Sequence, residues 1–361
     1  MSRAEPEAAD PRACLRAVVA GRDLSAAEAE ALFGEIMDGR VPQILIGALL
    51  AALAAKGETV QEIAGAARVM RARAERLTTS RGPLVDTCGT GGDFSGTFNV
   101  STTAALVAAA GGAAVAKHGN RAASSKSGSA DVLEALGVAI ELAPAAAGRC
   151  LDEVGIAFLY APRFHPAMRH AIEARRAVGI RTIFNLLGPV TNPAGARRQV
   201  AGVPEARWVE PVARVLADLG AEHALVVHGE ERLDELSVAG PTRVAEVRDG
   251  DVRLRTVTPT DLGLDPTGPD DRVSGGDAAE NARVTESILA GRGTPAQSAI
   301  TAANAGAALY VAGRTATLRE GVDMARQILA EAKAVDVLHA LVEASQRLAR
   351  EEEEGKRPEG K

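Results

Sequence analysis

The sequence predicts an α/β protein, with a small all-helical domain followed by a larger α/β domain that has a mainly parallel central sheet. Residues 1–80 carry helical patterns and no strand signal, whereas short Val/Ile/Leu runs alternate with helical segments from Leu84 onward. Repeated strand–helix–strand order favours a parallel sheet with both faces covered. Of the 361 residues 46% are hydrophobic but only 2% are aromatic, so small aliphatic side chains must build the core.

Helix-start signals mark the predicted helical domain over residues 1–80. The sequences SAAE at 25–28 and TVQE at 59–62 match the capping box, in which a hydroxyl and a carboxylate satisfy free amides at a helix start. The apolar run at 44–55 is too short to span a bilayer and predicts a buried helix. A helical stretch at about 165–189 interrupts the later alternation, and we expect it to join this domain.

The α/β domain is predicted over residues 81–345. Its expected strands are at 83–87, 113–119, 138–142, 156–162, 198–204 and 223–229. Asp249 and Gly250 lie between two alternating runs and indicate a β-hairpin over 242–257. Helices are expected to return after Asp277, and residues 346–361 form a charged tail that we expect to be flexible.

Composition and charge argue against several functional classes. The formal net charge is −6 and the chain has one Trp and two Tyr, so no nucleic-acid partner is expected. No signal-peptide pattern or membrane-spanning run is visible, and no membrane partner is expected. Cys14, Cys88 and Cys150 are far apart without a zinc-ligand spacing, which favours a reducing, cytoplasmic setting.

A glycine-rich turn, CGTGGD at 88–93, follows the first expected strand and precedes a helix. Glycines let successive backbone amides converge on an oxyanion, and the helix start adds partial positive charge. Phe94 stands where a dinucleotide fingerprint needs glycine, and the Gly-Lys-Ser/Thr ending of a Walker loop is absent. Taken alone, the turn is equally compatible with a ligand-free connection. Cys88 could be a nucleophile, but a small buried cysteine under the loop is the favoured interpretation.

A second polar loop adds positive charge. Basic or imidazole side chains and serines gather in residues 117–129, namely Lys117, His118, Arg121, Lys126, Ser124, Ser125, Ser127 and Ser129. Such a mixture of cationic, hydroxyl and amide donors is typical of a phosphate site. A solvated polar loop is the alternative, but the position between a buried strand and a helix favours a ligand site.

Two adjacent carboxylates, Asp234 and Glu235, come just after the strand expected at 223–229. Carboxylates at the carboxyl end of a strand can hold Mg²⁺ together with substrate phosphates. Such a pair alone more often complements a helix N-terminus, so a metal role depends on a phosphate ligand opposite it.

The chain contains, in this order, the motifs DTCGTGGD, TFNVST, KHGNRAASSKSGSADVLEALG, HPAMR, GIRTIFNLLGPVTNP and LDELS. Together these motifs resemble the anthranilate phosphoribosyltransferase family, in the family's order, within a similarity that runs from about residue 12 to 345. The resemblance implies a homodimer formed through the helical domain. It also implies a glycosyltransferase of tryptophan biosynthesis with Mg²⁺ as cofactor. Such an enzyme transfers the phosphoribosyl group of 5-phosphoribosyl 1-diphosphate to the amino group of anthranilate, giving N-(5′-phosphoribosyl)anthranilate and diphosphate.

The resemblance also implies site residues, position by position. The implied contacts of phosphoribosyl diphosphate are Gly89, Gly92, Asp93, Thr97, Asn99, Val100, Ser101, Thr102, Lys117, His118, Gly119, Asn120, Arg121, Ala122, Ala123, Ser124, Ser125 and Ser129. The implied anthranilate contacts are Gly89, Asn120 and Arg175, with His118 and His165 near the entry path of the amine. The implied Mg²⁺ ligands are Ser101, Asp234 and Glu235.

The chemistry implied by this resemblance needs charge stabilisation more than a base. Diphosphate that leaves an anomeric carbon needs cationic and amide donors, among them Lys117 beside the metal-bound diphosphate. The aromatic amine is nearly neutral in water, so positioning it is the larger task and no dedicated catalytic base is expected. Arg175 is expected to hold the anthranilate carboxylate; a surface ion pair is its alternative role.

Three other functions stay open at this point. A pyrimidine nucleoside phosphorylase would bind phosphate and would not need the pair Asp234–Glu235. A paralogous phosphoribosyltransferase with another acceptor would be expected to lose Asn120 and Arg175. A non-enzymatic polyanion-binding protein would explain the loops but would bind without turnover.

Overall fold

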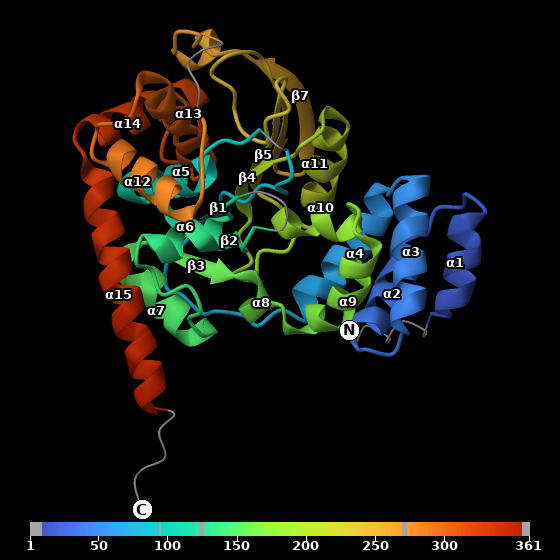
Figure 1. Ribbon diagram of the computed structural model, residues 1–361. Coiled ribbons are helices and arrows are strands. Elements are labelled where there is room, and N and C mark those ends of the chain that lie inside the picture. The colour runs from blue at the N-terminus through green and yellow to red at the C-terminus, as the bar shows by residue number, and fades with distance from the viewer. Residues whose placement is uncertain (1–8, 94, 123–125, 269–272, 356–361) are drawn as a thin grey trace, which may run out of the picture.

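The computed structural model describes residues 9–93, 95–122, 126–268 and 273–355. A helical unit lies at one side of the molecule, and a larger unit that contains the sheet lies at the other (Figure 1). This arrangement confirms the predicted class of a small helical domain beside an α/β domain with a mainly parallel sheet. Among the described residues, no helix is long and apolar enough to cross a membrane.

Helices of the first unit begin where the capping signals predict. Ser25 and Glu28 form a capping box at the start of α2, and Thr59 and Glu62 form one at the start of α4.

The α-helices of the described chain are α1 (Pro11–Val19), α2 (Ala26–Met37), α3 (Gln43–Lys56), α4 (Val60–Ala72), α5 (Val100–Ala110), α6 (Ser129–Ala135), α7 (Pro144–Val154), α8 (Ala161–Phe164), α9 (Arg169–Val178), α10 (Ile183–Val190), α11 (Val209–Asp218), α12 (Ala278–Leu289), α13 (Pro295–Val311), α14 (Leu318–Ala330) and α15 (Lys333–Gly355). Short 3₁₀ helices are η1 (Pro166–Met168), η2 (Ala206–Trp208) and η3 (Thr260–Leu262).

The strands of the described chain form one sheet in the order β3-β2-β1-β4-β5-β6-β7. They are β1 (Leu84–Asp86), β2 (Ala114–Gly119), β3 (Ile156–Tyr160), β4 (Arg198–Gly202), β5 (His223–Gly229), β6 (Thr242–Arg248) and β7 (Asp251–Val257). The strands β1 to β5 pair in parallel, and the predicted hairpin β6–β7 adds an antiparallel edge. The strand order reverses between β1 and β4. This creates a switch point outside their carboxyl ends, where open α/β sheets bind ligands.

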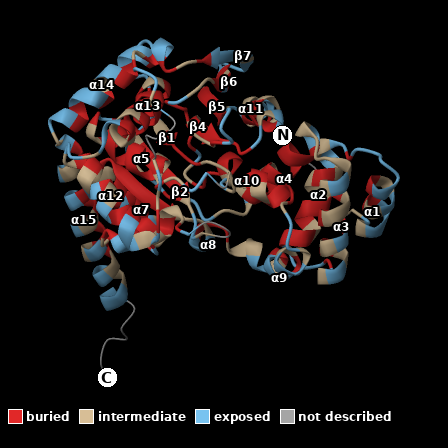
Figure 2. Cartoon of the chain, turned by 45° about the horizontal axis from the view of Figure 1, so that its top comes forward, coloured by how far each residue is buried: buried red, intermediate tan, exposed pale blue. Residues whose placement is uncertain are grey.

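The sheet contributes side chains to two hydrophobic cores. Leu225 and Val227 of β5 face the core built with α5 and α13, whereas Ala224 and Val226 face the core that α4 and α11 share with the helical unit. Successive strand residues point to opposite faces, so β5 belongs to both cores. Figure 2 shows that the central strands and inner helices are largely buried, while the outer faces of α14 and α15 are exposed.

The stretch at 165–189 lies against the N-terminal helices. Phe184 of α10 packs edge-on against Phe33 of α2, with ring centroids 5.7 Å apart. Gln43 at the start of α3 donates its side-chain amide to His170 O (2.8 Å) and accepts a hydrogen bond from the Ala174 amide (3.0 Å). These contacts attach α9 and α10 to the helical unit although they follow β3 in the chain.

Two local expectations differ from the structure. Residues 138–142 form a turn and no strand, with Val138, Ile140 and Leu142 buried, because the Ala139 amide donates to Ser345 Oγ (3.1 Å) and not to a neighbouring strand. Residues 346–355 are not a flexible tail but continue α15, because Leu348 is buried against the core. The remainder of the expected tail lies outside the described residues.

Candidate active site

Three chain segments meet outside the carboxyl ends of β1, β4 and β5. The glycine-rich turn leaves β1, and its Thr90 amide donates to Gly202 O at the end of β4 (2.9 Å). The segment after β5 brings in Asp234, whose carboxylate accepts a hydrogen bond from the Gly91 amide at 3.1 Å. This approach requires glycine, since a Cβ on Gly202 would lie 1.6 Å from Asp234 O. The switch point is therefore lined by backbone amides and carboxylates.

Three carboxylates, Asp93, Asp234 and Glu235, gather at this point. Glu235 Oε1 accepts a hydrogen bond from the Ser101 amide in the first turn of α5 (3.0 Å). Burial, followed by repulsion from the neighbouring carboxylates, raises the pKa of both Asp234 and Glu235. Crowded carboxylates of this kind suit a divalent cation, and Mg²⁺ prefers carboxylate oxygens together with substrate phosphates. The donor set around Asp234, Glu235 and Ser101 fits Mg²⁺.

Lys117 is a buried cation near the end of β2. Its Nζ donates to Thr87 O (2.8 Å) and to Thr87 Oγ1 (3.3 Å), which ties the ammonium to the start of the glycine-rich turn. Burial raises the pKa of Asp86 to about 6, and the charge of Lys117 opposes that rise. Lys117 also favours the ionised form of Glu235. The ammonium thus lies where it can stabilise anionic groups on both sides.

His118 and His165 lie together, with ring centroids 5.1 Å apart. His118 Nδ1 is 3.1 Å from Gly188 O, and the buried Nε2 has no hydrogen-bond partner in the described part of the chain. Burial lowers the pKa of His118 to about 3 and that of His165 to about 4. Both rings are therefore neutral at pH 7 and suit contact with an uncharged aromatic amine.

The first turn of α5 contributes one hydroxyl that has no partner within the described chain, that of Thr102. Its N-cap residue, Asn99, is held in place, since Nδ2 donates to Ser127 O (3.2 Å) and Oδ1 accepts from Asn281 Nδ2 (2.9 Å). Thr102 Oγ1 is buried and has no partner among the described residues. The amides of this turn are already engaged, since Val100 N donates to Phe98 O (2.8 Å), Ser101 N to Glu235 and Thr102 N to Asn99 O (3.2 Å). The Thr102 hydroxyl is therefore the donor that this turn can offer to an anion.

The second polar loop lies beside this space but is partly engaged elsewhere. Arg121 is exposed and forms an ion pair with Glu134 (2.7 Å), which already balances its charge within the protein. Asn120 O accepts a hydrogen bond from Ser129 Oγ at 3.3 Å, which closes the loop onto α6. Three expected contacts lie outside the described residues: Ala123, Ser124 and Ser125.

Arg175 and Arg176 are neighbours with different surroundings. Arg175, in the last turn of α9, is half-buried, and its guanidinium carbon lies 5.2 Å from the centroid of the Phe184 ring. Burial lowers its pKa, and no described carboxylate offsets that effect. Arg176 is exposed to solvent. Arg175 can therefore bind a ligand carboxylate, for which a guanidinium supplies paired donors.

Comparisons with known proteins place the chain in a family. Residues 12–74 match the helical bundle domain of a glycosyl transferase family, and residues 81–335 match its a/b domain. The chain is 53% identical over 340 residues to the anthranilate phosphoribosyltransferase of Symbiobacterium thermophilum, covering 94% of this chain and 99% of that protein. The chain belongs to the anthranilate phosphoribosyltransferase family.

Other members of the anthranilate phosphoribosyltransferase family are similar to this chain in sequence and in fold. The protein of Anaeromyxobacter dehalogenans (strain 2CP-C) is 55% identical over 326 residues, covering 90% of this chain and 96% of that protein. The crystal structure from Thermus thermophilus matches with a TM-score of 0.86 and 46% identity, covering 92% of this chain and 99% of that chain. The Saccharomyces cerevisiae enzyme in complex with PRPP and Mg shares the fold, with a TM-score of 0.84, 23% identity and coverage of 93% and 98%.

Two further residues, Asp86 and Arg181, hold parts of the candidate site in place, and neither is assigned a role from the sequence alone. Asp86 accepts hydrogen bonds from the His118 amide (3.1 Å) and from Asn192 Nδ2 (2.8 Å). Arg181 donates Nη1 to Gly91 O at 2.9 Å. The available signals were an acidic residue at the end of an apolar strand, and an arginine inside the quoted motif GIRTIFNLLGP.

The cysteines of this family member are buried free thiols: Cys14, Cys88 and Cys150. Burial raises the pKa of the Cys88 thiol, although it lies beside the glycine-rich turn. A thiol with a raised pKa stays protonated and is a poor nucleophile. The structure therefore favours packing under the loop as the role of Cys88.

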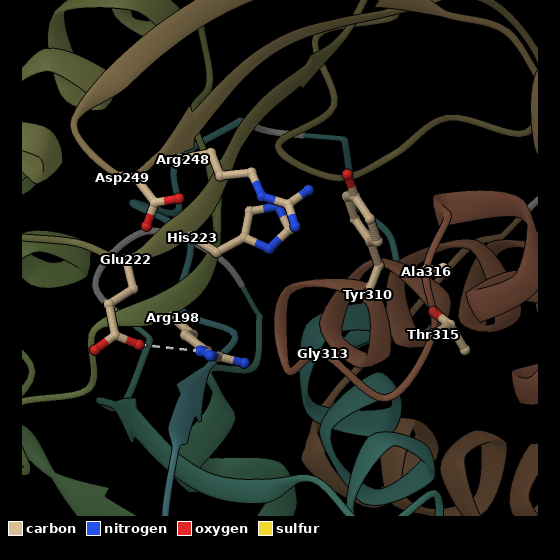
Figure 3. Close-up of a pocket in the computed structure, with 9 residues that line it drawn as sticks. All are labelled: Arg198, Glu222, His223, Arg248, Asp249, Tyr310, Gly313, Thr315 and Ala316. Carbon is tan, nitrogen blue, oxygen red and sulfur yellow. Dashed lines mark hydrogen bonds and ion pairs between the residues drawn. The ribbon is translucent and has the colours of Figure 1, made fainter.

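A polar cavity of about 390 Å³ opens at the other edge of the sheet, near the amino ends of β4 and β5 (Figure 3). It is lined by Arg198, Glu222, His223, Arg248, Asp249, Tyr310, Gly313, Thr315 and Ala316. Arg198 pairs with Glu222 (3.2 Å), and His223 Nε2 lies 2.9 Å from Glu246 Oε1, so these polar groups already have partners within the protein. The candidate active site of this chain is therefore the switch point and not this cavity.

Proposed function

We propose that this chain transfers the phosphoribosyl group of 5-phosphoribosyl 1-diphosphate to the amino group of anthranilate, in tryptophan biosynthesis. The products are N-(5′-phosphoribosyl)anthranilate and diphosphate. One observation carries the proposal: a carboxylate cluster, a buried lysine and a glycine-rich turn meet at the switch point of a chain 53% identical to such an enzyme.

We assign phosphoribosyl diphosphate to the space between the glycine-rich turn, the first turn of α5 and Lys117. Charge develops on the diphosphate as the bond from its oxygen to C1′ breaks, and fixed amides, the Thr102 hydroxyl and the ammonium stabilise it. Mg²⁺ held by Asp234, Glu235 and Ser101 would neutralise part of the same charge.

We assign Arg175, His118 and His165 to the binding of anthranilate. Arg175 would hold the carboxylate, and Asn120 and Gly89 would complete the contacts. The amine nitrogen then forms its bond to C1′ as the bond from C1′ to the diphosphate oxygen breaks, and the proton that the nitrogen loses passes to the released diphosphate or to water. Since His118 and His165 are neutral and the amine is uncharged, orientation and not deprotonation is the main requirement.

We also propose a homodimer formed through the helical unit and a cytoplasmic location. Apolar side chains are exposed on α1, α3 and α9, with 71% of Val19, 90% of Ile44 and 39% of Ile172 accessible. The helices that carry these residues pack against one another, α1 on α3 and α3 on α9, and exposed apolar residues on one helical unit support a protein interface there. Buried free cysteines without a disulfide among the described residues support a reducing compartment.

The test is the fluorescence of anthranilate mixed with protein, phosphoribosyl diphosphate and Mg²⁺. We expect a loss of signal that needs the metal, and we expect Asp234→Asn to slow it at least about tenfold by removing a metal ligand. Arg176→Ala, at an exposed position, is the matched control and should keep the rate. A flat signal, with diphosphate still released in the presence of another amine, would show that the acceptor is wrong.

A further inference from the structure

Arg181 reaches the glycine-rich turn from the opposite side of the site. It lies in the connection between α9 and α10, and its Nη1 donates to Gly91 O at 2.9 Å. The next residue of the turn leaves room for this contact, because a Cβ on Gly92 would lie 1.9 Å from Nη1. Gly92 also has a φ of +76°, a conformation that residues with a side chain rarely adopt. The Arg181 guanidinium thus occupies the space that a side chain at position 92 would need.

Carboxylates lie near the Arg181 guanidinium. Burial lowers the pKa of Arg181, and the negative charges of Asp234, Glu205 and Asp93 partly offset that effect. Its second nitrogen, Nη2, is buried and has no hydrogen-bond partner in the described part of the chain. A guanidinium can hold a carbonyl with one nitrogen and keep its charge near anionic groups, which an ammonium at the same place does less well.

Arg181 is also connected to the helical unit. Two residues after it α10 begins, and Phe184 of that helix packs on Phe33 of α2. Arg175, six positions earlier, lies over the same Phe184 ring. One short segment therefore carries the arginine assigned to anthranilate and the arginine that holds the diphosphate turn.

We propose that Arg181 is a positioning residue. It fixes the Gly91–Gly92 turn through Nη1, and its charge stabilises the adjacent carboxylates Asp93 and Asp234, so that the turn is preformed for the diphosphate. The inference rests on the proposed function and adds a residue to the same site. Arg181 holds the Gly91–Gly92 part of the turn, which we assign to the diphosphate, whereas Gly89 is the residue of the turn assigned to the acceptor. The loss should therefore fall mainly on phosphoribosyl diphosphate.

The test compares Arg181→Gln and Arg181→Lys with Arg176→Gln as the matched control. Losing a charge-assisted hydrogen bond should raise the KM for phosphoribosyl diphosphate about ten- to hundredfold, with the KM for anthranilate within about threefold. Titration calorimetry with phosphoribosyl diphosphate and Mg²⁺, without anthranilate, should show the same weakening of binding. Arg181→Lys should recover part of it, because the positive charge remains near Asp93 and Asp234.

The outcomes separate the two proposals. Wild-type protein that binds no phosphoribosyl diphosphate in the calorimeter would overturn the proposed function itself. Wild-type binding that Arg181→Gln leaves unchanged would overturn only the role of Arg181. An equal rise in both KM values, together with a lower melting temperature and no recovery in Arg181→Lys, would show a purely structural role and would also reject the inference.

Discussion

Arg175 is the arginine whose surroundings leave it free to bind a ligand carboxylate. Arg175→Ala removes one charge-assisted pair, so we expect the KM for anthranilate to rise about ten- to hundredfold and the KM for phosphoribosyl diphosphate to stay within about threefold. Steady-state kinetics with each substrate varied in turn would measure both values. Arg176→Ala changes the same kind of side chain at an exposed position and should behave as wild type. An equal change in both KM values would contradict the assignment.

The buried histidines make stability depend on pH. Burial lowers the pKa of His165 to about 4 and that of His118 to about 3, whereas an unfolded imidazole titrates near ~6.5. Below that value the unfolded state binds more protons than the folded state, so the free energy of unfolding falls as pH falls from about 7 toward 4. For His165 the loss amounts to about 2 kcal/mol at pH 5. Asp86, whose pKa burial raises to about 6, acts in the opposite direction over the same range.

We therefore expect His165→Gln to flatten the pH dependence of the melting temperature, because the variant has no imidazole to protonate at this position. Thermal melts at pH values from about 7 to 5 would show a smaller drop for the variant than for the wild type. His339→Gln is the control, since His339 is exposed on α15. A slope unchanged from wild type would mean that the His165 ring is not kept neutral by the fold.

At the scale of secondary-structure elements, the sequence predicts best those helix starts and turns that depend on residues close together in the chain. The capping box at Ser25 and the hairpin turn at Asp249 and Gly250 depend on side chains only a few positions away. The bond from Arg181 to Gly91 joins positions 90 residues apart, and no local pattern encodes it. Residues 138–142 look like a strand because four of the five are apolar, yet a contact with α15 decides their conformation. The polar loops of the candidate site could thus be found in the sequence, while the groups that fix them required the fold.

The close approach of α13 and α14 depends on glycine. A Cβ on Gly306 would lie 2.5 Å from the backbone nitrogen of Val322, so Gly306→Ala must push the helices apart. We expect a net loss of about 1–3 kcal/mol in the free energy of unfolding, since overpacking outweighs the better helix propensity of alanine. Chemical denaturation would measure it. Gly355→Ala, where nothing lies within 4 Å, is the control, and an equal effect of both substitutions would refute the packing argument.

At the scale of the whole molecule, the helical unit is continuous with the sheet. Ile63 of α4, Val212 of α11 and Val226 of β5 belong to one core. The same core includes Phe184, which lies beside Arg175. Packing of this kind holds the segment that carries Arg175 and Arg181 in a fixed relation to the carboxyl ends of the strands, which is what a site built from both units requires.

The exposed apolar face of the helical unit around Ile44 and Ile172 is the proposed dimer interface. Ile44 and Ile172 lie near each other, because Gln43 bonds to His170 O and to the Ala174 amide on either side of Ile172. If this face is the dimer interface, the double variant Ile44→Asp/Ile172→Asp buries unpaired charge there. Such a charge costs roughly 3–5 kcal/mol per site, enough to weaken association more than about a hundredfold. Sedimentation velocity at micromolar concentration should then show a monomer where the wild type is a dimer. Leu254→Asp, on the exposed edge strand β7, should leave the dimer intact. A wild type that is monomeric, or a double variant that stays dimeric, would place the interface elsewhere or remove it.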